Sequence, residues 1–97
     1  MFAEDLQHAA LCQWKGLIYA AGWADGALWF KYSEDGGRTA GEIPGVGTRA
    51  RVCEAEEQQP AIEVLTTSEL VVALDRAGEV VVYYSADQGA TWNPVVG

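Results

Sequence analysis

Two short stretches of the chain contain the residue types best suited to chemistry, and the spacing is the same in both. Each has serine, aspartate, glycine and threonine at alternate positions: Ser33, Asp35, Gly37 and Thr39 in "YSEDGGRT", and Ser85, Asp87, Gly89 and Thr91, followed by Trp92, in "YSADQGATW". A hydroxyl beside a carboxylate could serve in catalysis or bind a metal ion. After a strand, however, Ser and Asp side chains accept hydrogen bonds from backbone N–H groups ahead of them, and glycine supplies the positive φ of a tight turn. We therefore expect both sets to stabilise turns, with no catalytic residue and no metal site.

These stretches are parts of a longer repeat. Residues 30–40 match residues 82–92, an interval of 52 positions because 82 − 30 is 52. Upstream, "LIYAAGWADGALWFKYS" aligns with "LVVALDRAGEVVVYYS" if one inserted residue is allowed, and "AEDLQHA" from Ala3 matches "AEEQQPA" from Ala55 at the same interval. Self-similarity at a fixed period indicates a repeated structural unit. Nearly the whole chain is therefore two copies of one unit.

Within each copy the apolar residues alternate or form short continuous runs rich in Val, Tyr, Trp and Ile. This pattern is typical of strands, and "WADG" and "DRAG" have the composition of hairpin turns. The expected strands are residues 9–14, 17–23, 27–33 and 48–54 in the first copy, and 61–66, 69–75 and 79–85 in the second. No stretch has the 3.6-residue period of an amphipathic helix, so we expect an all-β fold without helices.

The pattern Ser-x-Asp-x-Gly-x-Thr-Trp resembles the Asp-box, or BNR repeat, of sialidases and other β-propeller proteins. The second copy contains it in full, and the first departs from it only at Ala40, which stands in place of the tryptophan. The resemblance implies a single domain, 1–97, made of two consecutive four-stranded antiparallel β-propeller blades, blade 1 at about 9–54 and blade 2 at about 61–97. It also implies that the motif residues are structural and lie away from the ligand face.

By the same resemblance, the ligand face contains the loops between the second and third strands of each blade. The candidate ligand-face residues are Trp23, Asp25, Asp75 and Arg76. Sialidases, as the family implies, use three arginines, a tyrosine nucleophile with a glutamate partner and an aspartate acid, drawn from most of six blades. Two blades cannot supply that set, because Arg76 is the only arginine in a predicted ligand-side loop. We therefore expect sialidase-like blades without the sialidase active site, no enzymatic activity and no cofactor.

The two copies differ in the residues after the motif. After the first motif, "GEIPGVGTRARVCEAEE" is long enough for a fourth strand, whereas only "NPVVG" comes after the second. We therefore expect the second blade to lack its outer strand, and both outer faces of the blade pair to be uncovered. Unpaired edges and uncovered repeat faces favour association. The predicted partners are another protein, or further copies of the chain that complete a propeller, for example three chains forming six blades.

Composition narrows the choice of partners. Fourteen acidic residues against six Lys and Arg give a net charge of −8, which opposes binding to nucleic acid and to anionic membrane surfaces. The sequence shows no basic, apolar leader and no long apolar segment, so we expect neither a signal peptide nor a transmembrane segment. Three strand spacings, roughly 14 Å, would separate Cys12 from Cys53 within one blade, too far for a disulfide. We expect two free thiols, with a disulfide between neighbouring copies of the chain as the alternative.

Two functions fit these features. The first is a non-catalytic module that binds protein, for instance as a structural or decorating component of a large particle such as a phage virion. The second is a small oligomeric carbohydrate-binding lectin, because Trp and Tyr rings stack on sugars beside carboxylates; Trp23 and Asp25 would be the best pair. However, Trp23 aligns with Leu74 or Asp75, so the aromatic residue is not repeated. This difference favours protein assembly over glycan binding.

Overall fold

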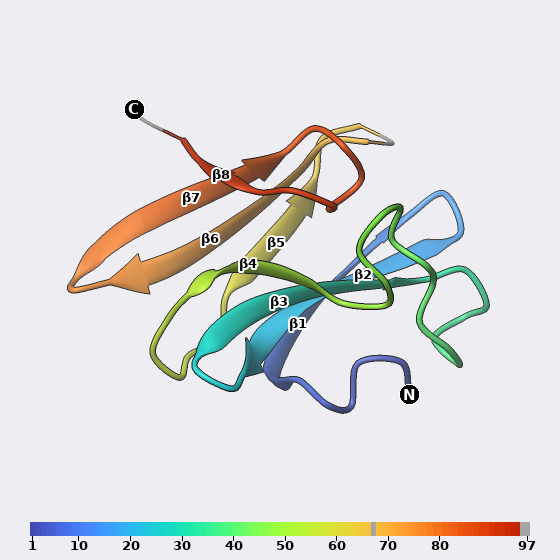
Figure 1. The fold of residues 1–97 in the computed structure, drawn as a ribbon, viewed down its shortest axis with the longest axis horizontal. Coiled ribbons are helices and arrows are strands. Elements are labelled where there is room, and N and C mark those ends of the chain that lie inside the picture. The colour runs from blue at the N-terminus through green and yellow to red at the C-terminus, as the bar shows by residue number, and fades with distance from the viewer. Residues whose placement is uncertain (67, 96–97) are drawn as a thin grey trace.

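The computed structural model describes residues 1–66 and 68–95, and its regular secondary structure is entirely β (Figure 1). Two four-stranded antiparallel sheets follow one another along the chain, in the orders β1-β2-β3-β4 (the first sheet) and β5-β6-β7-β8 (the second sheet). The strands are β1 (Gln7–Trp14), β2 (Leu17–Ala24), β3 (Ala27–Ser33), β4 (Ala50–Glu54), β5 (Ala61–Val64), β6 (Leu70–Arg76), β7 (Glu79–Ser85) and β8 (Asn93–Pro94). No helix occurs among the described residues, so the all-β prediction is confirmed. Residues 96–97 of the second predicted blade lie outside the described residues.

Three hairpins with two-residue turns join neighbouring strands. The central residues all have positive φ: Lys15 and Gly16, Asp25 and Gly26, and Ala77 and Gly78. Positive φ at both positions is the geometry of a type I′ turn, whose twist matches that of the strands it joins. Glycine at the second position has no Cβ to oppose this conformation. The turns therefore fix the register of the three hairpins, and with it the face to which each side chain points.

β3 and β7 have the predicted bounds, and other strands differ at their ends. β4 begins at Ala50 rather than at 48, and β5 ends at Val64 rather than at 66. β5 ends early because the chain turns there: the Thr66 N–H donates to the Glu69 carbonyl over 3.3 Å, and the Glu69 N–H donates back to the Thr66 carbonyl over 3.2 Å. The apolar run in the sequence continues past the point where pairing stops.

The second sheet has an outer strand, so the prediction that it lacks one is wrong. β8 pairs with β7, with Pro94 opposite Tyr83 and Asn93 opposite Tyr84. The Val95 N–H continues this pairing by donating to the Val82 carbonyl over 2.7 Å. Proline is tolerated because β8 is an edge strand. A strand of two residues cannot show an alternating pattern in the sequence.

The two sheets pack face to face around a shared core. Because alternate residues of a strand point to opposite faces, each sheet has an inner face toward the other sheet and an outer face away from it. Phe30 of the first sheet and Leu70 and Val72 of the second are fully buried between the inner faces. The Phe30 ring centroid lies 5.9 Å from that of Tyr19 and 5.5 Å from that of Trp92. The second motif thus contacts the core of the first sheet.

Residues 1–6, here called the N-terminal cap, cover the outer face of the first sheet. In Figure 1 the cap runs on the side of this sheet remote from the second sheet. Phe2, Ala3 and Leu6 are 5%, 0% and 7% exposed, and they pack against Ala20 and Ala24. Burying a side chain such as Phe or Leu contributes roughly 1.5–3 kcal/mol. The prediction that both outer faces are uncovered is therefore wrong for the first sheet.

A glycine lets the N-terminal cap approach the first sheet closely. A Cβ on Gly22 would lie 2.8 Å from the Cβ of Leu6, which is too close for both atoms. Gly22 is opposite Trp29, and Leu74 is opposite Val81, the residue 52 positions after Trp29. Gly22 and Leu74 are therefore equivalent positions of the two copies. The first copy thus has no side chain at the position over which Leu6 lies.

Replacement of Gly89 by alanine tests how tightly the second motif packs on the core. Gly89 has a φ of 91°, and an added Cβ would overlap the buried ring of Phe30. Positive φ costs an alanine about 1–2 kcal/mol, and overpacking a core costs about 1–3 kcal/mol. We expect Gly89→Ala to lower the free energy of unfolding by about 2–5 kcal/mol in urea denaturation.

Gly37→Ala is the matched control for this substitution. Gly37 has the same motif position and a φ of 96°, but a Cβ there would meet only side-chain carbons of Ile18 and Phe2, at 3.8 Å. This variant should lose only the backbone contribution, about 1–2 kcal/mol. Equal losses in the two variants would show that Phe30 can move away from residue 89, against our expectation.

Candidate functional site

Residues 33–39 form a turn that is stabilised by its own side chains. The Gly37 N–H donates to Ser33 Oγ over 2.9 Å, and the Ser33 hydroxyl donates to Asp35 Oδ1 over 2.7 Å. The Thr39 N–H donates to Asp35 Oδ1 over 3.0 Å, and its hydroxyl donates to Asp35 Oδ2 over 2.5 Å. The serine and aspartate oxygens are thus occupied by donors within the turn.

Residues 85–91 repeat this arrangement. Ser85 Oγ accepts from the Gly89 N–H over 2.9 Å, and Asp87 accepts from the N–H and the hydroxyl of Thr91 over 2.9 and 2.6 Å. The second turn adds the Trp92 indole, whose N–H donates to the Gly89 carbonyl over 2.8 Å. Ser85 is fully buried, as is its equivalent Ser33. Both sets of residues therefore organise the backbone where β3 and β7 end.

The hydrogen bonds of these turns favour the charged carboxylates. Donors on Thr39 and Ser33 hold the pKa of Asp35 well below its ordinary value. At Asp87, partial burial opposes the charge, but hydrogen bonds from Thr91 and Ser85 outweigh this effect and lower the pKa. A carboxyl with a lowered pKa binds its proton more weakly in the folded than in the unfolded state. Its contribution to stability is therefore present above the unfolded pKa, near 4, and is lost as the pH falls below it.

Cys12 and Cys53 are free thiols, as predicted. Burial raises the pKa of the Cys53 thiol, and a thiol that stays protonated is a poor nucleophile. Within residues 1–66 and 68–95, no three side chains of His, Cys, Asp or Glu are arranged to hold a metal ion. The same residues contain no helix that is long and apolar enough to span a membrane.

The structure separates the predicted ligand-face residues of the first copy. Trp23 lies on β2 and is half-buried, and its indole N–H donates to the Ala55 carbonyl over 2.8 Å. Asp25 is exposed in the β2–β3 turn, and its carboxylate lies 3.9 Å from the guanidinium of Arg49. Each side chain is thus engaged with a different part of the first copy.

Asp75 and Arg76, the predicted ligand-face residues of the second copy, line a groove of about 970 Å³ between the end of β4 and the β6–β7 turn. Arg76 donates to the Glu54 carbonyl over 2.8 Å and to the Tyr83 hydroxyl over 3.2 Å. Asp75 Oδ1 accepts from the Gly78 N–H over 2.9 Å. The side chains of Asp75 and Arg76 are thus bonded to other parts of the chain, and Arg76 joins the ends of the two sheets.

The outer face of the second sheet is largely apolar, and no other part of residues 1–66 and 68–95 covers it. Its inner-face residues Leu70 and Val72 are fully buried, whereas the residues that alternate with them point outward and are exposed or half-buried. The outward residues are Ala61, Glu63, Val71, Ala73, Asp75, Val80, Val82 and Tyr84. Sequence reasoning missed this surface as a site. Its signal is the continuous apolar run of β7, "VVVYY", which is typical of a strand that is buried on both faces.

The repeat shows what such a face normally contacts. Val80 and Val82 are equivalent to Leu28 and Phe30, since 80 − 28 and 82 − 30 both equal 52. Leu28 and Phe30 are fully buried beneath the second sheet, while Val80 is 78% exposed. The same face of the repeated unit is therefore covered in the first copy and open in the second.

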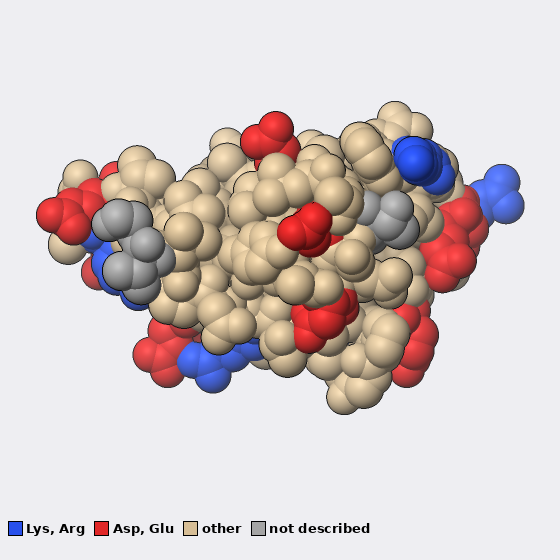
Figure 2. Space-filling view, turned by 90° about the horizontal axis from the view of Figure 1, so that it is seen from above, with Lys and Arg blue, Asp and Glu red and all other residues tan. Residues whose placement is uncertain are grey.

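This open face has a one-sided charge. Its outward carboxylates are those of Glu63 and Asp75, and Glu69 accepts from the outward Tyr84, whereas Arg76, the one cation of residues 61–95, is bound to Glu54 and Tyr83. Figure 2 shows the molecule from the side on which β7 and β8 lie: acidic side chains stand in the middle of a largely uncharged surface, and Lys and Arg gather toward its ends. Such a surface is complementary to one that combines apolar residues with cations.

Comparisons with protein-family models, curated proteins and solved structures found no match to this chain. The resemblance of the two turns to Asp-boxes therefore stays a prediction, as do the four ligand-face residues. The described residues establish a contrast between the sheets: the first is covered on both faces, and the second is open on its outer face.

Replacing both motif aspartates with asparagine should flatten the acid limb of the stability curve. We expect the Asp35→Asn/Asp87→Asn variant to be less stable than the wild type at pH 7, because Asn offers one acceptor oxygen where the carboxylate offers two. Between about pH 5 and pH 2 the wild type should lose stability more steeply than the variant, because only the wild type must protonate these carboxylates. Urea denaturation across this range measures both effects.

Glu79→Gln is the control, because it removes an exposed carboxylate of β7 that lies outside both turns. Its pH profile should follow that of the wild type. A double variant whose stability falls with pH as steeply as the wild type's would show that the acid sensitivity arises elsewhere.

Proposed function

We propose that this chain is a non-catalytic Asp-box β-propeller module that acts in protein assembly, as a component of a larger particle, through the outer face of its second sheet. The observation that carries the proposal is the repeat equivalence of the two sheets. Leu28 and Phe30 are fully buried by the next unit, whereas within the described residues no unit covers their equivalents Val80 and Val82. A partner that covers this face would bury the outward residues of the second sheet, as the second sheet buries Leu28 and Phe30 of the first.

The chemistry of the face supports a protein partner. Valine and alanine side chains on a sheet offer apolar area, each buried Å² of which contributes roughly 25 cal/mol, and few hydrogen-bonding groups that could recognise a small polar molecule. Two of the predicted ligand-face side chains are already paired, the Trp23 indole with Ala55 and Arg76 with Glu54 and Tyr83. These pairings leave the lectin alternative without a specific supporting observation.

Val80→Asp tests this function. It places a charge on the most exposed of the outward valines without changing the buried core. We expect the mean mass of the wild type, measured by light scattering at rising concentration, to exceed the 10.4 kDa of one chain, and that of Val80→Asp to stay at this value. Val46→Asp, the same change at a 45%-exposed loop position, should behave as the wild type does.

A trimer of the wild type would agree with a closed ring of six blades. Association that persists in Val80→Asp, or is lost equally in Val46→Asp, would contradict assembly through this face. A wild type that remains a single chain at every concentration would exclude self-association and the oligomeric lectin together.

A further inference from the structure

The surface beneath the N-terminal cap combines apolar residues with two cations. Lys31 on β3 points to the outer face of the first sheet and is only 8% exposed. The guanidinium carbon of Arg49 lies 3.9 Å from the centroid of the Trp29 ring on the same face. With Ile18 and Ala20, these residues form what we call the socket. Two cations on an apolar surface need an anionic and apolar cover.

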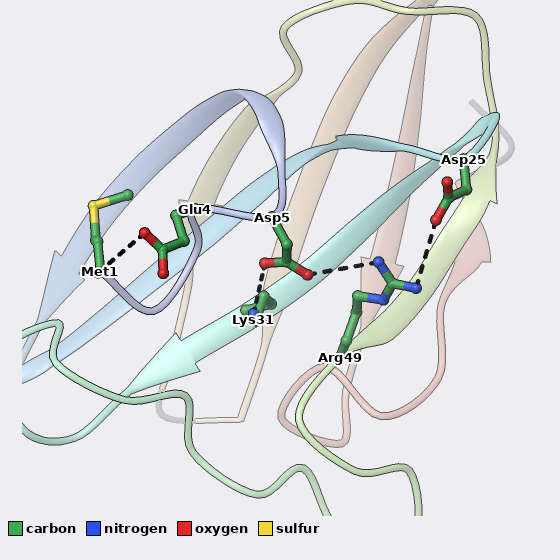
Figure 3. Close-up of polar contacts among 6 residues, drawn as sticks. All are labelled: Met1, Glu4, Asp5, Asp25, Lys31 and Arg49. Carbon is green, nitrogen blue, oxygen red and sulfur yellow. Dashed lines mark hydrogen bonds and ion pairs between the residues drawn. The ribbon is translucent and has the colours of Figure 1, made fainter.

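The N-terminal cap provides such a cover with one carboxylate. Figure 3 shows Asp5 between the two cations: its Oδ1 lies 2.8 Å from Lys31 Nζ, and its Oδ2 lies 3.6 Å from Arg49 Nη1. Phe2 and Leu6 supply the apolar part. The neighbouring Glu4 points away from this pair and is 80% exposed, so Asp5 is the one carboxylate of the cap on the socket, while Asp25 of the β2–β3 turn lies 3.9 Å from Arg49 on its other side.

The open face of the second sheet has the chemistry of the cap on a larger area. Its apolar part contains Val80 and Val82 among others. Its anionic part contains Glu63, which is exposed, and Glu69, which accepts hydrogen bonds from the Tyr84 hydroxyl and, over 2.9 Å, from the Thr66 hydroxyl. Open face and socket are therefore complementary in polarity and in charge.

The interface between the two sheets shows how the open face and the socket would pair. Trp29 and Lys31 of the socket are equivalent to Val81 and Tyr83, since 81 − 29 and 83 − 31 both equal 52. Val81 and Tyr83 lie on the inner face of the second sheet, packed against the inner face of the first. The socket of the first sheet is thus equivalent to the inner face of the second sheet. That inner face already covers the first sheet.

We infer that the open face of one copy docks on the socket of a second copy of this chain, and that the N-terminal cap occupies the socket until the second copy displaces it. This inference rests on the proposed function, because it names the partner of the same face. The contact is head to tail, so each copy can offer one face and receive another. Docking of two open faces on each other would instead bring carboxylates together without a cation.

Loosening the cap should strengthen association, because the cap competes with the second copy for one surface. Asp5→Lys places a third cation beside Lys31 and Arg49, and deletion of residues 1–6 removes the cap entirely. We expect both variants to associate at a concentration about tenfold or more below that of the wild type. Glu4→Lys makes the same charge change at an exposed position and should leave association unchanged. Far-UV circular dichroism checks folding, and Asp5→Lys keeps the test valid should the deletion variant not fold.

A mixing experiment tests the polarity of the contact. The Asp5→Lys/Val80→Asp variant has an accessible socket and a blocked open face, whereas the wild type has an intact open face. By analytical ultracentrifugation the variant alone should be a single chain, and its mixture with wild type should contain a one-to-one complex. Glu4→Lys/Val80→Asp, whose cap is intact, should bind wild type about tenfold or more weakly.

The outcomes separate this inference from the proposed function. If wild type self-associates in a Val80-dependent manner but does not bind the Asp5→Lys/Val80→Asp variant, the open face is an interface and the socket is not its partner. Equal binding of the two mixed variants would overturn the role of the cap. If Val80→Asp weakens no association at all, the proposed function fails and this inference fails with it.

Discussion

A sheet that is apolar on both faces must be covered on both faces, and this constraint governs the structure. The strands β2 and β3 place small or aromatic residues on either side, so the first sheet needs two covers. The second sheet is one of them and the N-terminal cap is the other. The second sheet has the same two-sided character in β7, but the described residues cover only its inner face. The apolar character of the open face therefore follows from the repeat, because the equivalent face of the first sheet is buried and apolar.

The repeat made most of the fold predictable. The 52-residue interval, the alternating patterns and the hairpin signals together predicted two sheets, seven of the strands and the turns at Asp25–Gly26 and Ala77–Gly78. β8 was not predicted because a strand of two residues has no periodic pattern. Its pairing depends on the direction in which the chain leaves the preceding turn. Trp92 helps to position β8 beside β7, since its indole packs on Phe30 and donates a hydrogen bond to the Gly89 carbonyl.

The N-terminal cap escaped prediction for a different reason. Its sequence matches the segment that begins at Ala55 and joins β4 to β5. The informative residues were those that differ: Phe2 and Leu6 stand where the second copy has Glu54 and Gln58. Apolar residues at positions where the second copy has polar ones indicate that the segment packs on an apolar surface. The candidate site was missed similarly, because the ligand-face residues were chosen from the motif resemblance, while the open face is defined by what the second sheet lacks above it.

Several departures from the repeat gather around the socket. Gly22 stands where the second copy has Leu74, and Ala40 stands where it has Trp92, and both positions face the N-terminal cap. Because Gly22 and Ala40 are small, the first sheet leaves space at these two positions. The segment that covers this face must fill that space with its own large side chains. The cap brings Phe2 and Leu6, and the open face of a second copy would bring Tyr84 and its valines. The socket has small residues at two positions and contains two cations. The cations require an anionic cover, but the small residues can accommodate covers of different shape. The socket is therefore suited to bind either the N-terminal cap or the open face of a second copy.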